Sequence, residues 1–204
     1  MLPKDKKNTF LIMKLSAIAL ISVILGILFI LSSHQEYLQS HPTRNEIVAP
    51  GPSSARPQVA DLQFPISKNE AVTMSSLHGS VVHLVFWASW CEPCVAEMPR
   101  LFELYKKLSE FYQTKSTRVP YKLVLINLDD GEIGLQAARK MIADMPNGIL
   151  SVFNGYPIAE KMLVEALPHH VIIDKSGHIA MTFEKSIEDN DDQLTAQLQK
   201  LLTD

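Results

Sequence analysis

Hydrophobic positions from residue 59 onward form short continuous runs that alternate with a segment of helical periodicity. Residues 81–87 (VVHLVFW) and 121–128 (YKLVLINL) are apolar runs of the kind buried in a central parallel sheet. Between them, apolar residues recur every three or four positions and predict one core-facing helix from about residue 93 to 112. Pro99 lies inside this helix and should kink it. The apolar stripe consists of Met98, Leu101, Phe102, Tyr105 and Leu108.

The following residues continue the alternation of strands and helices. A helix is expected between Gly131 and Met145, and residues 155–165 predict another short one. Residues 169–173 are predicted to form a third strand. The sequence Asp-Lys-Ser-Gly at 174–177 is a strong hairpin signal that leads into a fourth strand at 179–183.

Two further signals complete the predicted fold. Residues 61–66 alternate weakly and predict a short edge strand, because Pro65 cannot donate a ladder hydrogen bond. Asn190 or Asp191 can cap a last helix with an apolar face. This order of elements predicts an α/β fold, a three-layer α/β/α sandwich around a mixed central sheet. The apolar face of the last helix consists of Leu194, Leu198, Leu201 and Leu202.

The N-terminal segment has a different pattern. Residues 15–31 carry no charge, and with the next two serines the run approaches the roughly 20 residues that cross a bilayer core. Three lysines precede it, so the N-terminus should stay cytoplasmic while the rest is exported. A cleaved signal peptide is the alternative, but its apolar run should be shorter and end at small residues, where this chain has Leu31. We therefore expect an uncleaved transmembrane anchor.

The pattern divides the chain into three parts. Residues 1–33 form a cytoplasmic tip and the anchor, residues 34–58 a flexible linker, and residues 59–204 the folded domain. The linker is rich in proline, serine and other polar residues and lacks periodicity. A net charge of −3 provides no basic surface, so nucleic acid is not an expected partner.

The two cysteines of the chain, Cys91 and Cys94, stand at the junction of an apolar strand and a helix. Cα atoms three helical positions apart lie roughly 5 Å from each other, which suits a disulfide. Such a bond closes a very small loop and adds little stability, so redox chemistry explains it better than a static role. A zinc site would need further ligands, and the adjacent His169 and His170 point to opposite faces of a strand. No cofactor besides the redox-active disulfide is expected.

The chain resembles the membrane-anchored thioredoxin-fold thiol-disulfide oxidoreductases of the TlpA/ResA/CcmG (DsbE) group over residues 59–204. The resemblance rests on Phe-Trp-Ala-Ser-Trp-Cys-Glu-Pro-Cys at 86–94 and on Glu-Met-Pro at 97–99. It also rests on Pro168, which leads a strand, and on the sequence Ile-Asp-Lys-Ser-Gly-His-Ile at 173–179.

The positions of the site residues indicate their roles. Cys91 should be the attacking thiol, because a helix N-terminus stabilises a thiolate and lowers its pKa. Cys94, one turn further and more buried, should resolve the mixed disulfide. Glu97 lies three residues later on the same helix face, and the resemblance implies that it accepts the Cys94 proton. Plain thioredoxin uses an aspartate at the position of Val85. The alternative for Glu97 is an exposed acid that only complements the helix dipole.

The substrate side of the site is expected around Pro168. In the resembled fold this proline follows a cis peptide bond, which lets the backbone of Leu167 pair with an extended substrate. Trp90 is expected to line the substrate groove, and Trp87 to pack in the core. Pro93 suits the first helical turn, and Glu92 either tunes the thiolate or is an exposed residue without consequence.

His169 and His170 depart from the family pattern, which usually has small hydroxyl residues after this proline. One of them facing the cysteines would make the redox chemistry depend on pH. A packing role is the commoner one for a strand histidine, and we adopt it as the interpretation.

These features predict a single-pass protein of the inner membrane whose domain faces the periplasm and reduces disulfides of a protein substrate. The resemblance implies apocytochrome c as the foremost client and a membrane electron donor of the DsbD/CcdA type. A periplasmic oxidant or isomerase, and a copper-binding assembly factor for a respiratory oxidase, are the alternative functions. Reductant and oxidant differ in reduction potential, where about 30 mV corresponds to roughly 1.4 kcal/mol.

Overall fold

The structure is a computed structural model that describes residues 58–59, 61–67, 70–114, 119–187 and 192–203, together with position 26. The expected anchor apart from position 26, nearly all of the expected linker, and the capping positions Asn190 and Asp191 lie outside the described residues. Within the described part of the chain, no helix combines the length and the apolar character needed to cross a membrane.

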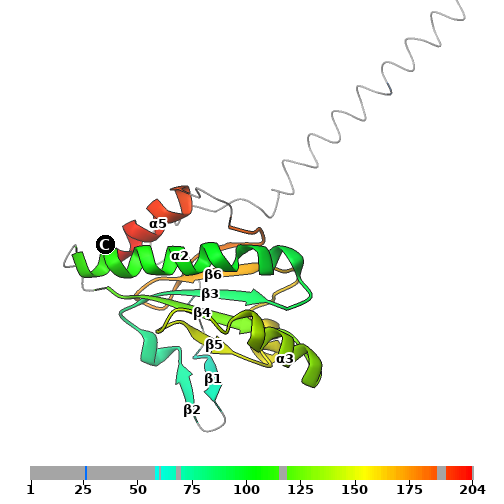
Figure 1. Ribbon diagram of the computed structural model, residues 1–204. Coiled ribbons are helices and arrows are strands. Elements are labelled where there is room, and N and C mark those ends of the chain that lie inside the picture. The colour runs from blue at the N-terminus through cyan, green and yellow to red at the C-terminus, as the bar shows by residue number, and fades with distance from the viewer. Residues whose placement is uncertain are drawn as a thin grey trace, which may run out of the picture. The chain divides into compact units, whose positions relative to one another are not determined.

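A five-stranded mixed sheet forms the centre of the domain, with the order β5-β4-β3-β6-β7 (Figure 1). β3 pairs in parallel with β4, and β4 pairs in parallel with β5, whereas β6 and β7 run antiparallel. The four predicted strands and the mixed sheet are confirmed. β5 was not predicted, since three residues are too few for a periodic signal. The strands are β3 (Val81–Trp87), β4 (Tyr121–Asn127), β5 (Leu150–Val152), β6 (His169–Ile173) and β7 (Ile179–Phe183).

Four α-helices belong to the described residues: α2 (Glu92–Thr114), α3 (Gly131–Met141), α4 (Tyr156–Lys161) and α5 (Asp192–Thr203). α2 runs along one face of the sheet, with α5 beside it (Figure 1). The predicted helices are confirmed, and α2 contains Pro99 as expected. In α5, Leu194, Leu198 and Leu202 are buried, as their spacing predicts.

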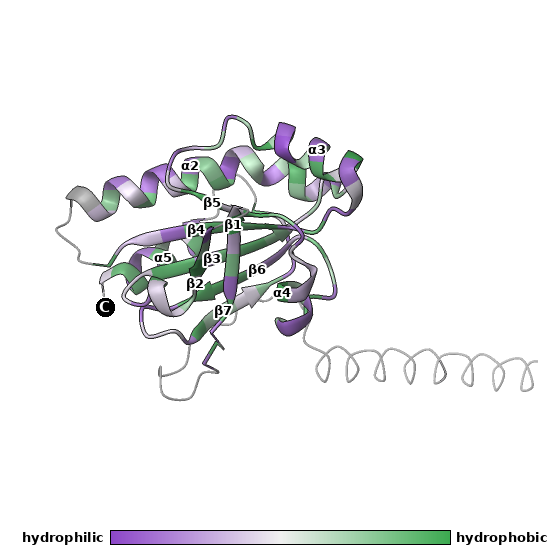
Figure 2. Cartoon of the chain, turned by 90° about the horizontal axis from the view of Figure 1, so that it is seen from below, coloured by the Kyte–Doolittle hydropathy of each residue, from purple (hydrophilic) through white to green (hydrophobic). Residues whose placement is uncertain are grey.

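The strands alternate their side chains between two hydrophobic clusters. Val85 and Trp87 of β3 join the cluster beneath α2 and α5, which we call the α2 face. Leu84 and Phe86 join the cluster on the opposite side, which we call the hairpin face. Figure 2 shows the central strand β3 coloured mainly hydrophobic, whereas the helices carry hydrophilic residues as well. β3 is buried along its whole length, which is typical of a central strand.

The hairpin face is covered by β1 (Gln63–Ser67), β2 (Glu70–Thr73), the 3₁₀ turn η2 (Ser75–Leu77) and α4. The strand predicted at residues 61–66 is present, but it pairs with β2 in a separate two-stranded sheet. This hairpin buries Phe64 completely and, together with α4, covers this face of the sheet, where the predicted sandwich has helices alone. β2 was not predicted.

Candidate active site

The two cysteines lie where β3 passes into α2. Cys91 directly precedes the helix, which begins at Glu92, and Cys94 occupies its first turn. The two residues are joined by a disulfide, with their Cα atoms 5.3 Å apart, close to the expected separation. Cys91 retains 6% exposure, whereas Cys94 has none. The rim position of Cys91 makes it the sulfur that a substrate can reach.

The backbone beyond Cys91 presents a hydrogen-bond donor to its sulfur. The N–H of Cys94 lies 3.3 Å from the Cys91 Sγ in hydrogen-bond geometry. Together with the positive end of the α2 dipole, this donor would stabilise a thiolate on Cys91 and lower the pKa of its thiol. The geometry therefore fits the expected division of labour between an attacking and a resolving cysteine.

The loop before Cys91 is held by the carboxylate of Asp129, which follows β4 and is buried. The backbone N–H of Ser89 donates to Asp129 Oδ2 at 2.7 Å, and the Ser89 hydroxyl donates to Oδ1 at 2.6 Å. The Asn127 amide donates to Oδ2 at 2.6 Å. Asp129 was not predicted as a site residue. One signal in the sequence could have indicated its role. Asn127 and Asp129 stand at the carboxyl end of β4, and Cys91 follows the carboxyl end of the neighbouring strand β3.

Glu97 is fully buried on α2, one turn beyond Cys94. Its Oε2 accepts the backbone N–H of Ile187 at 2.8 Å, and its Oε1 has no hydrogen-bond partner among the described residues. Burial raises the pKa of Glu97 to about 8, against the smaller lowering effects of the Ile187 hydrogen bond and the Arg100 charge. The alternative of an exposed acid is therefore wrong. The burial and raised pKa are those of a residue that can exchange a proton near neutral pH.

The two strand histidines point to opposite faces, as their adjacency predicts. His169 packs edge-on against Phe86, with ring centroids 5.9 Å apart, and its Nδ1 lies 3.2 Å from Glu184. His170 lies on the α2 face, with its Nε2 3.4 Å from Glu97 Oε2. His169 therefore has the packing role that was expected of both histidines. His170 instead contacts Glu97, the predicted acid–base residue.

Two further polar residues of this face were missed by the sequence analysis. His83 of β3 lies with its Nε2 3.0 Å from His170 Nδ1, and its Nδ1 2.7 Å from the hydroxyl of Tyr121. Both residues are buried. The signal was a histidine in the middle of an apolar run that otherwise reads as a buried strand.

A groove of about 530 Å³ opens at Cys91. Trp90 lines it, as predicted, and is 68% exposed; Glu92, Pro93 and Leu167 line it as well. Further lining comes from Leu128, Tyr156, Val164, Glu165 and Ala166. The lining thus combines apolar side chains with two carboxylates, those of Glu92 and Glu165.

Pro168 and Trp87 lie behind this surface. The Leu167–Pro168 peptide bond is cis, as predicted, and Pro168 itself is buried and does not line the groove. Trp87 is completely buried in the core of the α2 face, which confirms its expected packing role. Val85, at the position where plain thioredoxin has its buried aspartate, is also buried. As a valine it cannot accept a proton, which leaves Glu97 as the predicted proton acceptor.

Comparison with known proteins agrees with this geometry. A model of a thioredoxin-like family matches residues 79–179. The thiol-disulfide oxidoreductase ResA of Bacillus cereus is 31% identical over 135 residues, which cover 66% of this chain and 70% of that protein.

Solved structures extend the comparison. A thiol:disulfide interchange protein DsbE from Chlorobium tepidum superposes with a TM-score of 0.58 at 26% identity, covering 72% of this chain and 96% of that one. A secreted thiol-disulfide isomerase from Corynebacterium glutamicum reaches a TM-score of 0.62 at 17% identity, with coverage of 80% and 96%, and shows the shared fold. The chain therefore belongs to the thioredoxin-like thiol-disulfide oxidoreductases of the ResA type, and it is a redox enzyme with a disulfide-bonded Cys91–Cys94 pair.

Proposed function

We propose that the protein reduces disulfides of exported polypeptides, using Cys91 and Cys94 as the redox pair and Glu97 as the proton acceptor. The observation that carries the proposal is the place of Glu97, a fully buried acid one turn beyond the fully buried sulfur. A buried thiol is a poor nucleophile until a base removes its proton. A carboxyl group whose pKa is raised to about 8 matches that task near neutral pH.

The cycle begins with the reduced enzyme. The Cys91 thiolate attacks one sulfur of the substrate disulfide, forms a mixed disulfide, and releases the other substrate sulfur as a thiolate that takes up a proton. Cys94 then gives its proton to Glu97 and attacks the Cys91 sulfur. The second substrate sulfur leaves as a thiolate and is protonated in turn. The substrate gains two electrons, and the enzyme ends with the Cys91–Cys94 disulfide.

The substrate would lie in the groove at Cys91. Trp90 and Leu167 supply apolar contact, Glu92 and Pro93 form the helix side, and the cis peptide before Pro168 shapes the wall at Leu167. An extended segment could pair with the Leu167 backbone by strand addition. Apocytochrome c, whose paired cysteines must be reduced before haem attachment, is the client that the likeness to ResA and DsbE proteins favours.

We further propose where the protein resides and how it is supplied with electrons. The charge-free residues 15–31 would anchor the protein in the inner membrane, with the catalytic domain in the periplasm. An oxidising compartment would keep the cysteine pair oxidised, so a membrane electron donor of the DsbD/CcdA type would have to reduce it after each turnover.

The reduction potential of the Cys91–Cys94 pair tests the direction of electron flow. It can be measured by equilibrating the protein with glutathione or dithiothreitol buffers and trapping free thiols. We expect a value well below about −150 mV, since oxidants of this fold lie near −120 mV. A value above about −150 mV would overturn the reductant function and favour the oxidant or isomerase.

A trapping experiment tests the client class. Cys94→Ser protein should accumulate a mixed disulfide with an oxidised apocytochrome c peptide, because the resolving sulfur is missing. The matched control is the same peptide with its cysteines replaced by serine. Equal trapping of unrelated oxidised peptides would refute apocytochrome c as a preferred client.

A further inference from the structure

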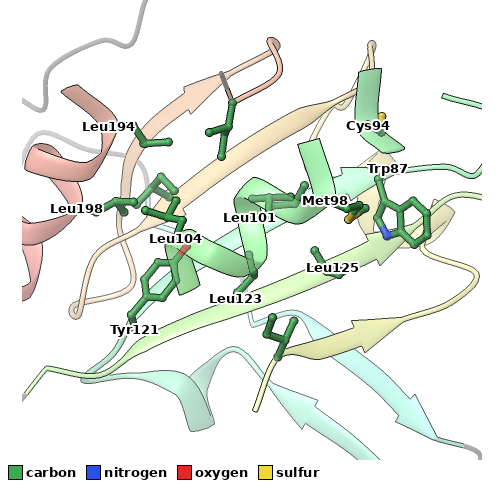
Figure 3. Close-up of a cluster of buried hydrophobic side chains, with 14 of the residues drawn as sticks. Trp87, Cys94, Met98, Leu101, Leu104, Tyr121, Leu123, Leu125, Leu194 and Leu198 are labelled. Atoms are coloured by element: carbon green, nitrogen blue, oxygen red, sulfur yellow. The ribbon is translucent and has the colours of Figure 1, made fainter. Parts of the chain in front are cut away.

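A chain of four buried polar side chains, joined by two hydrogen bonds and one close polar contact, crosses the apolar core of the α2 face. It runs from Tyr121 of β4 through His83 of β3 and His170 of β6 to Glu97 of α2, and we call it the relay. Its contacts measure 2.7 Å from the Tyr121 hydroxyl to His83, 3.0 Å between the imidazoles, and 3.4 Å from His170 to Glu97. Figure 3 shows Tyr121 and Cys94 at opposite ends of this core, with Leu101 between them.

The direction of the hydrogen bonds follows from the Tyr121 end. The Tyr121 hydroxyl has His83 Nδ1 as its hydrogen-bond partner, with no second partner among the described residues. A buried hydroxyl hydrogen without an acceptor is costly, so Tyr121 donates and His83 Nδ1 accepts. In a neutral imidazole the other nitrogen then carries the hydrogen. His83 Nε2 therefore donates to His170 Nδ1, and His170 Nε2 presents its N–H towards Glu97 Oε2.

The surroundings keep this direction constant. Burial and the neighbouring His170 lower the pKa of His83 well below its usual value, so His83 stays neutral. Burial and Tyr105 raise the pKa of the Tyr121 hydroxyl, so it keeps its proton. Phe183 of β7 stacks on the His170 ring, with centroids 4.3 Å apart, and fixes its plane.

We propose that Tyr121, His83 and His170 are positioning residues that hold an N–H donor on Oε2 of Glu97 and so reserve Oε1 for the Cys94 proton. This inference rests on the proposed function of Glu97. Two N–H groups, from His170 and Ile187, then approach Oε2, while Oε1 has no partner among the described residues. Donors on one oxygen stabilise the carboxylate form of Glu97, which must be present before Cys94 can give up its proton.

The other charged or titratable groups near Glu97 also influence how strongly its carboxylate is stabilised. Arg100, from the same helix, lowers the pKa of Glu97, and Tyr105, also from α2, lies beside Tyr121 with ring centroids 6.2 Å apart. From β7 the neighbour is the apolar ring of Phe183. α5 contributes the apolar Leu194 and Leu198 to the same cluster. His170, on β6, is thus the side chain that presents a neutral N–H to the carboxylate.

The test is the pH dependence of the resolving step in a single turnover. Reduced protein is mixed with a peptide disulfide, and the decay of the mixed disulfide is followed between pH 5 and pH 10. His170→Leu should move the midpoint upward by about half to one pH unit, since one hydrogen bond contributes roughly 0.5–1.5 kcal/mol and one pKa unit equals about 1.4 kcal/mol. Tyr121→Phe should move it in the same direction by less.

Tyr105→Phe is the matched control, because it removes a neighbouring tyrosine hydroxyl, bonded to the Asn147 carbonyl, that is no part of the relay. Its midpoint should equal that of the unchanged protein. An unchanged midpoint in both relay variants would overturn the inference. If Glu97→Gln itself kept the original pH profile, the failure would instead lie with the proposed proton acceptor.

Nitrogen NMR of the unchanged protein provides a second measurement that does not depend on variants that fold. Both His83 and His170 should appear as neutral Nε2–H tautomers from pH 5 to pH 8. An Nδ1–H tautomer at either residue, or a protonated His83 at pH 6, would overturn the direction of the relay whatever the direction of electron flow.

Discussion

The two faces of the central sheet are built from alternate residues of the same strands, yet they bury different chemistry. On the hairpin face, β3 and β4 contribute Leu84, Phe86, Val124 and Ile126, all fully buried and apolar. On the α2 face, the same two strands contribute His83 and Tyr121, which join a buried network, together with leucine and valine.

The difference between the two faces shows where this fold can bury polar side chains. A buried polar side chain is tolerable when its hydrogen bonds are satisfied, and its position must then be exact because each partner constrains the next. The α2 face adjoins the catalytic helix, so its polar chain can act on Glu97. The hairpin-face cluster reaches the groove at Cys91 through the apolar Leu128 and Leu167, and it otherwise serves stability.

The largest expected effect is the loss of activity when the attacking cysteine, at the active-site end of the α2 face, is replaced. Cys91→Ser should abolish disulfide reduction, because the remaining cysteine, Cys94, is completely buried and cannot attack the substrate. Insulin or peptide-disulfide turnover measures the loss. Cys94→Ser is the informative companion, since it should retain the first attack and accumulate mixed disulfide. Turnover by Cys91→Ser protein would contradict the assignment of the attacking sulfur.

A large residue on the hairpin face should affect stability alone. Phe64→Ala should lower the free energy of unfolding by about 3–5 kcal/mol, because it opens a cavity at a fully buried position. Denaturant unfolding measures this change. The pH midpoint of the resolving step should stay where it is, and a shift would break the separation of the two faces. Ile126→Val, expected to cost about 0.5–1.5 kcal/mol, serves if the first variant does not fold.

Glu97→Gln should slow the resolving step by about a hundredfold or more, because general acid–base catalysis contributes roughly 10²- to 10⁴-fold. Glutamine keeps an oxygen for the Ile187 N–H and the shape of the side chain. The first attack by Cys91 should be nearly unchanged, and stopped-flow measurement separates the two steps. An unaltered resolving rate would exclude Glu97 as the proton acceptor.

The effect expected to be smallest, counted per pH unit, is the pH dependence of stability caused by Glu97. Its pKa is raised from 4.5 to about 8 on folding, so between these values the folded protein holds a proton that the unfolded chain has released. The free energy of unfolding should therefore fall as pH rises through this window, by about 1.4 kcal/mol per pH unit, relative to Glu97→Gln. Parallel curves for the two proteins would show that the carboxyl group is not buried in solution.

Much of this architecture could be predicted from local sequence. Strands β3, β4, β6 and β7 follow from apolar runs and turn residues, and α2 and α5 follow from helical periodicity. β1 carried a weak signal that could not tell which partner it pairs with, since its hairpin with β2 depends on the fit of Phe64 against the sheet.

By itself, the sequence determined the redox pair and its neighbourhood. Cys91 and Cys94 are three positions apart at a strand–helix junction, and Glu97 is one turn further, so local helical geometry places all three. Only the tertiary structure decided what lies opposite Glu97. The relay joins residues 38 and 87 positions apart in the chain, and their contact depends on strand order and register rather than on any local pattern. The carboxylate of Asp129 likewise reaches the loop before Cys91 from 40 positions away, because β3 and β4 are neighbours in the sheet.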